Sequence, residues 1–195
     1  ALLLQLIIAS VNPIPFSTLV KSEIANGFYS ASFDYSPGEI LSQYEMISPT
    51  SYAHAKTNMP GKILFYHFIR LVTENPRVLA YLVISISSLG GLLLYGICSL
   101  LFTDKTTAWY AFILYALVPA KLDFFPILNT VTPVFILACL LLLILFIRSG
   151  KLFWLIILGL GLYILVLFEP TPLTSGLIFV GILIHALATR HIQTK

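Results

Sequence analysis

The sequence predicts an all-α, polytopic membrane protein: a bundle of about six transmembrane helices with a structured loop on one side. Composition is the first reason, because 58% of the 195 residues are hydrophobic and only 10% are charged, whereas a soluble domain has roughly 25% charged residues. Patterning is the second reason. The apolar residues form long runs, and about 20 of them cross the roughly 30 Å of bilayer hydrocarbon. We expect a single membrane domain, 1–195.

Five apolar segments follow the loop, over residues 77–189. Prolines, glycines and charged residues separate them, and such residues end helices. Residues 1–11 are apolar but supply only half a span, so we expect a first helix that is cut or processed. A cleaved signal peptide is the less favoured alternative, because no basic residue precedes the apolar run. The five expected spans are Val78–Phe102, Thr106–Ala120, Ile127–Ile147, Leu152–Phe168 and Leu173–Thr189.

Lysines and arginines in the connections predict the orientation, since cytoplasmic loops carry an excess of them. The turns at 103–105 and 148–151, together with a cytoplasmic tail at 190–195, carry five basic residues against one acidic residue. The opposite set, which includes the loop 12–76, carries six basic residues against seven acidic ones. We therefore expect a multi-pass protein of a prokaryotic plasma membrane whose long loop is extracytoplasmic.

The loop 12–76 is expected to contain short helices. Ser36 and Glu39 have the spacing of a capping box, which predicts a helix that starts there and continues to about residue 47. An earlier helix is expected at 18–25, with Asn26-Gly27 as its C-cap.

A third helix is expected after Pro60-Gly61, with a polar and an apolar face. Such a helix lies on the membrane surface, and its basic face is expected to point toward the phosphate headgroups.

Several classes of protein are disfavoured. Cys98 and Cys139 both lie in apolar segments, so neither a disulfide framework nor a zinc site is expected. The net charge of +3 is small and spread along the chain, so no nucleic acid is expected as a partner. A small-molecule transporter would want ionisable groups at mid-membrane, and the five expected spans supply none.

The loop also carries a pattern that resembles a known family. Asp34 stands between aromatic residues, and the segment 54–62 reads HAKTNMPGK, just before an amphipathic helix and a run of spans. This pattern resembles the polytopic membrane glycosyltransferases of the C superfamily, such as protein mannosyltransferases and aminoarabinose transferases. Members use dolichyl- or polyprenyl-phosphate sugars, carry an essential Asp or Glu in the first outside loop, and often have a His-Pro-Pro-Gly-like sequence. The resemblance covers residues 12–187.

The resemblance implies transfer of a sugar from a polyprenyl-phosphate donor to an acceptor glycan, lipid or protein, with inversion at the anomeric carbon. A carboxylate would accept the proton of the acceptor hydroxyl, and cations would stabilise the departing phosphate. Asp34 takes the role of base by this resemblance. Secondary acidic candidates are Glu39, Glu45 and Glu169. The candidates for binding the lipid phosphate are Lys62, Lys56, His54, Arg70 and Lys121.

Each candidate has a structural alternative. Asp34 would bond to backbone amides at the next helix start, Glu39 is explained by its capping box, and Glu45 would lie on a solvated face. Lys121 would pair with Asp123 at a helix end. Glu169 would be an exposed turn residue, and the other basic residues would attract anionic lipid headgroups.

The alternative function is a non-catalytic membrane subunit or lipid-binding scaffold, with additional membrane subunits as partners. No cofactor is certain, and a divalent metal is left open. An enzyme needs Asp34 and at least one lysine to face a common cavity. A scaffold could leave these residues scattered.

Overall fold

The computed structural model describes residues 3, 5–7, 11 and 14–189. In this part of the chain every regular element is a helix, so the predicted all-α class is confirmed. The half-span expected at 1–11 lies largely outside the described residues, and the tail 190–195 lies wholly outside them.

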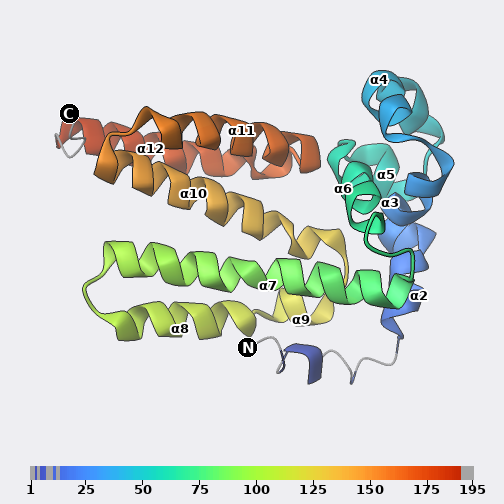
Figure 1. Ribbon diagram of the computed structural model, residues 1–195, viewed down its shortest axis with the longest axis horizontal. Coiled ribbons are helices and arrows are strands. Elements are labelled where there is room, and N and C mark those ends of the chain that lie inside the picture. The colour runs from blue at the N-terminus through green and yellow to red at the C-terminus, as the bar shows by residue number, and fades with distance from the viewer. Residues whose placement is uncertain (1–2, 4, 8–10, 12–13, 190–195) are drawn as a thin grey trace.

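Five helices lie side by side along the long axis of the molecule, and each runs opposite to the one before it (Figure 1). Among the described residues, three segments are long and apolar enough to cross a bilayer, namely Pro76–Leu101, Leu128–Ser149 and Thr171–Ala188. The five helices are α7 (Pro76–Leu101), α8 (Lys105–Ala116), α10 (Thr132–Ser149), α11 (Leu152–Phe168) and α12 (Ser175–Ala188).

Two of the five expected spans are short. Helix α8 has 12 residues, or about 18 Å at the usual rise, which is well below the thickness of the hydrocarbon. It ends early because Val118 precedes a proline and adopts an extended conformation. Helix α11 has 17 residues, at the lower limit for a span. The count of six spans is therefore not confirmed.

The loop domain, which we define as residues 16–75, stacks across one end of the bundle (Figure 1). We call this end of the bundle the loop end and the opposite end the far end. The connecting helices α9 (Pro119–Asp123), η2 (Leu128–Thr130) and η3 (Thr171–Thr174) join the spans. The loop domain contains α2 (Phe16–Lys21), α3 (Glu23–Asp34), α4 (Pro37–Ile47), η1 (Ser48–Thr50), α5 (Ala53–Thr57) and α6 (Gly61–Arg70).

The loop domain and the bundle share one core. Phe28 of α3 and Tyr66 of α6 are buried in the same cluster as Leu79 and Val83 of α7 and Phe168 of α11. Full burial of one large apolar side chain stabilises a fold by about 1.5–3 kcal/mol. The loop domain is therefore fixed to the spans by packing as well as by the chain.

The start of the loop domain corrects the prediction. The helix expected at 18–25 is replaced by α2 and α3, and Asn26-Gly27 lies within α3 instead of ending a helix. Asn26 has non-helical angles (φ −153°, ψ 48°). Its side-chain amide donates to the Val20 carbonyl and the Tyr66 hydroxyl, both in the interior. These bonds compensate the kink, and α3 continues to Asp34.

Helix α6 begins where the sequence predicts, but its polar face does not point toward headgroups. Lys62 and Tyr66 are buried, whereas Phe68 is 70% and Leu71 83% exposed. The polar side chains find hydrogen-bond partners inside the protein, whereas Phe68 and Leu71 of the predicted apolar face are left on the surface. An apolar exposed face suits contact with lipid tails more than with phosphate groups.

The capping box predicted at the start of α4 is confirmed. The Glu39 backbone N–H donates to the Ser36 hydroxyl at 3.3 Å, and the Glu39 carboxylate accepts from the Ser36 backbone N–H at 2.8 Å. Hydrogen bonds from the Ser36 side chain and then its backbone lower the pKa of Glu39. The carboxylate is thus occupied at the helix start.

Replacing Ser36 by Ala is expected to cost α4 about 1 kcal/mol of local stability, because one backbone N–H loses its acceptor. Amide hydrogen exchange over residues 38–41 should then speed up roughly fivefold. Ser42→Ala is the matched control, since this hydroxyl only bonds the Gly38 carbonyl one turn earlier in the same helix. Equal exchange in the two variants would contradict the assignment of the cap.

Candidate functional site

Gly61 allows the first turn of α6 to lie directly against the end of α11. A Cβ atom at this position would overlap the Leu167 carbonyl and the Phe168 backbone. Only a residue without a side chain fits such an approach. The contact brings Lys62, the next residue, beside Glu169 at the C-cap of α11.

Lys62 is buried in a complete set of hydrogen bonds. Its Nζ atom lies 3.1 Å from Oε2 of Glu169, and the side chain is 1% exposed. Oδ1 of Asn58 and Oδ1 of Asn129 accept its other two protons at 3.2 and 2.7 Å. An ammonium has three N–H donors, so all are taken. Glu169 is held in turn by the Thr132 hydroxyl at 2.7 Å.

The Lys62–Glu169 pair links the loop domain to α10 and α11. Burial lowers the pKa of Lys62, and the nearby Glu169 carboxylate opposes that effect. The rings of Phe28 and Phe168 lie 5.3 and 5.6 Å from the ammonium and add cation–π attraction. Lys62, expected to bind a lipid phosphate, has no donor left for one. Glu169 is a partner of this lysine and not the exposed turn residue of the alternative.

Lys121 is a second buried cation, in α9. Its Nζ atom donates to the Ser87 carbonyl of α7 at 2.9 Å and lies 4.1 Å from the centre of the Tyr115 ring. The expected partner Asp123 is exposed, and within the described residues no carboxylate pairs with Lys121. Burial lowers the pKa of Lys121 to about 8. A buried ammonium without a counter-ion is costly, and an anion beside it would be stabilised.

A cavity of about 460 Å³, which we call the Lys121 cavity, opens beside this amine. Asn129 lines it and also accepts from Lys62, so the cavity borders the Lys62–Glu169 pair. Apolar walls with a few placed polar groups are typical of ligand sites. Besides Lys121 and Asn129, the wall includes Tyr115, Val118, Phe124, Thr130 and Pro133.

Close packing of α7 against α8 fixes the position of Tyr115 in the wall of the Lys121 cavity. A Cβ atom at Gly90 of α7 would overlap the Tyr115 ring. Gly90 and Gly91 therefore allow close packing of α7 on α8. The Tyr115 hydroxyl donates to the Ser87 carbonyl at 3.1 Å. The same carbonyl thus orients both the ring and the Lys121 amine.

Asp34 lies apart from this cavity. It is the last residue of α3, its side chain is exposed, and its Oδ2 atom accepts a hydrogen bond from the Tyr52 hydroxyl at 3.1 Å. It is not among the residues that line the Lys121 cavity. The start of the next helix is capped by Ser36. The Lys121 cavity therefore does not bring the expected base beside this lysine.

Two side chains of α6 hold the backbone on both sides of Asp34. Arg70 donates to the Ser32 carbonyl and lies 3.4 Å from the centre of the Phe33 ring. His67 donates from Nε2 to the carbonyl of the residue after Asp34 at 2.9 Å. Burial lowers the pKa of His67, which keeps the imidazole neutral near pH 7. Asp34 is thus an exposed carboxylate on a well-supported backbone.

The remaining candidates have different surroundings. Glu45 lines a cavity of about 470 Å³ together with Leu41, Met59 and Leu167. His54 and Lys56 are exposed on α5. Arg70, besides its contacts with α3, pairs with Glu74 at 2.8 Å. None of these basic residues lines the Lys121 cavity.

Several polar residues of the site were not among the residues predicted from the sequence. A short polar run, Asn129, Thr130 and Thr132, stands where an apolar span begins. Polar residues at such a position often have a function, so this placement could have identified them from the sequence. Asn58 lies in the segment that carries the family resemblance, but its role as a partner of Lys62 had no local signal. Tyr52 had none either.

Comparison with known proteins gives no relative: no family model, no curated protein and no solved structure matches the chain. Among the residues that the structure describes, no three His, Cys, Asp or Glu side chains gather where they could hold a metal ion.

Proposed function

We propose that the Lys121 cavity binds the phosphate group of a polyprenyl-phosphate-linked sugar, and that the chain is the membrane module of an inverting glycosyltransferase acting on the extracytoplasmic face. One observation carries the proposal. The Lys121 amine is buried beside a cavity, and no carboxylate pairs with it among the described residues. A phosphate would supply the missing negative charge through charge-assisted hydrogen bonds. Apolar walls such as Val118 and Phe124 suit the adjoining isoprenoid chain.

The proposed reaction is a single displacement. The acceptor hydroxyl oxygen attacks the anomeric carbon, its proton passes to a carboxylate, and the bond between that carbon and the phosphate oxygen breaks. Lys121 stabilises the negative charge that develops on the leaving phosphate. Asp34 stays our proposed base on the family resemblance alone. Its carboxylate is exposed and does not line the Lys121 cavity, so the proposal requires the donor sugar to extend beyond that cavity to reach it.

A second candidate function is favoured by the position of Asp34 outside the Lys121 cavity. In that case the chain binds the lipid phosphate without sugar transfer, as a scaffold or subunit of a larger membrane assembly. The two proposals share the lipid site and differ only in the role of Asp34.

Replacing Lys121 by Met keeps most of the side-chain volume and removes the charge. We expect the affinity for a polyprenyl-phosphate sugar to fall roughly ten- to hundredfold, the usual contribution of a hydrogen bond to a charged group. Binding can be followed by native mass spectrometry of the chain in detergent. Lys56→Met is the matched control, because it removes one exposed lysine of the same predicted set. Equal losses in both variants would contradict the Lys121 site.

Lipid binding is also expected to depend on pH. With the pKa of Lys121 near 8, the free amine is mostly charged at pH 7 and mostly neutral at pH 9. Because only the ammonium attracts the phosphate, affinity should fall roughly tenfold between these values. The phosphodiester of the donor keeps a constant charge over this range. Lys121→Met should abolish the dependence, and a dependence that persists in the variant would assign it to another group.

A further inference from the structure

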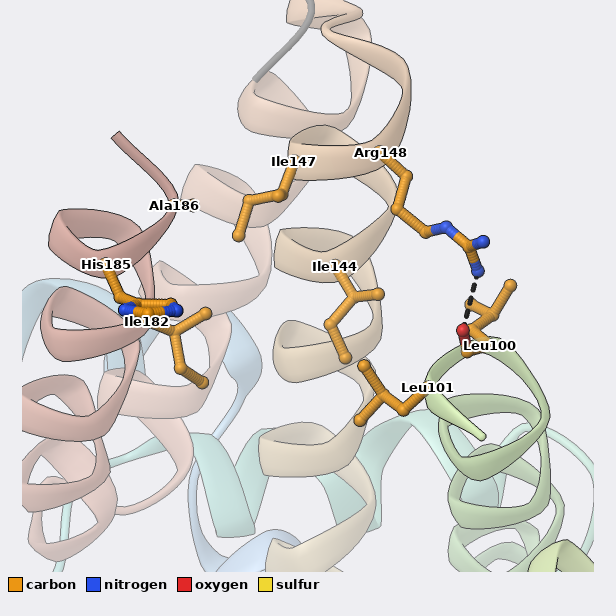
Figure 2. A pocket seen from close by; sticks show the side chains of 8 residues that line it. All are labelled: Leu100, Leu101, Ile144, Ile147, Arg148, Ile182, His185 and Ala186. Carbon is orange, nitrogen blue, oxygen red and sulfur yellow. Dashed lines mark hydrogen bonds between the residues drawn. The ribbon is translucent and has the colours of Figure 1, made fainter. Parts of the chain in front are cut away.

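A second cavity, of about 450 Å³, lies at the far end of the bundle between the last turns of α7, α10 and α12 (Figure 2). Its interior is apolar, and two polar side chains stand on opposite sides of it: Arg148 from α10 and His185 from α12 (Figure 2). Apolar residues of the wall include Leu101, Ile144, Ile147 and Ile182.

The Arg148 guanidinium is available to a ligand. It is exposed, and Nη1 donates to the Leu100 carbonyl in the last turn of α7 at 2.7 Å. A guanidinium has five N–H donors, and within the described residues no carboxylate pairs with this one. His185 is exposed across the cavity and has a ring N–H donor in either protonation state.

The charges near the cavity favour an anion. Lys105 begins α8 and Lys151 follows α10, both in turns at the far end. Asp104 is the acid of these two turns. Its carboxylate accepts from the backbone N–H groups of Thr106 and Thr107 at 2.9 and 3.1 Å, so it is occupied as a helix cap. Lys105, Arg148 and Lys151 outnumber this one acid, so the far-end turns keep a net positive charge.

We propose that this cavity holds an acyl chain of an anionic phospholipid, whose phosphate is bound by Arg148 at the rim. An apolar slot that ends at a positively charged rim matches a molecule with an apolar tail and a negative head. The site belongs to the leaflet opposite the loop domain, because Arg148 lies one residue before the end of the apolar segment Leu128–Ser149. It is independent of the Lys121 cavity at the loop end.

Native mass spectrometry of the chain, incubated in detergent with equal amounts of phosphatidylglycerol and phosphatidylcholine, tests the proposal. All proteins carry Lys121→Met, so that lipid at the loop end contributes little. We expect preferential retention of phosphatidylglycerol, reduced roughly fivefold by Arg148→Gln, the effect of one basic residue near a lipid phosphate. Lys151→Gln is the matched control, since this lysine belongs to the same turn but does not line the cavity.

Two further variants keep the test decisive. Arg148→Lys retains the charge and should recover most of the retention if Arg148→Gln acts through the phosphate. Ile182→Trp fills the cavity and should lower retention without a change in charge. The proposal is overturned if Lys151→Gln weakens retention as much as Arg148→Gln, if both lipids are retained equally, or if Ile182→Trp leaves retention unchanged.

Discussion

Replacing Glu169 by Gln is expected to destabilise the protein by about 3 kcal/mol, the lower end of the range for a broken buried ion pair. The reason is that the Lys62 ammonium, at 1% exposure, would stay buried without its counter-charge. For a chain of this size the melting temperature in detergent should drop by roughly 6–12 °C.

A double variant separates the charge from the packing. Lys62→Met combined with Glu169→Gln leaves no ion at this contact, so most of the lost stability should return. Glu45→Gln removes an exposed carboxylate and should leave the melting temperature unchanged. If Glu169→Gln melts like the unaltered chain, the pair does not stabilise the contact between the loop domain and the spans.

Replacing Asp34 by Asn is expected to lower sugar transfer by about 10²–10⁴-fold while binding of the lipid donor persists, because the amide cannot accept the proton of the acceptor hydroxyl. Transfer is measured in vesicles that contain the chain and a polyprenyl-phosphate sugar. Asp123→Asn is the matched control, since it removes another exposed carboxylate near the loop end.

The outcome of the Asp34 experiment decides between the two proposed functions. Loss of transfer with retained binding supports the glycosyltransferase. If the unaltered chain binds the donor but transfers nothing, or if Asp34→Asn transfers at the full rate, Asp34 is not a base and the scaffold is favoured.

Local signals in the sequence predicted some of the helices closely. Helix α11 has the predicted bounds, and α7 begins two residues earlier and ends one residue earlier than expected. The apolar runs and the prolines that delimit them act over a few residues, so they can be read without tertiary structure. The capping box of Ser36 and Glu39 belongs to the same class of signal.

Contacts between distant segments were not predictable in this way. The kink at Asn26 depends on the buried Tyr66 hydroxyl. Lys62 was expected to face lipid headgroups. The spacing of the polar residues shows that Lys62 belongs to the polar face of α6, but it does not show which segment packs against that face. Glu169 and Asn129, which take its protons, come from the end of α11 and the start of a span.

The most direct test of the lipid site is photocrosslinking with a polyprenyl phosphate that carries a diazirine on the isoprene unit next to the phosphate. We predict adducts on Tyr115, Val118 or Phe124, which line the Lys121 cavity, and their loss in Lys121→Met. Adducts on Leu41 or Met59, beside Glu45 in a separate loop-end cavity, with no effect of Lys121→Met, would contradict the proposed site.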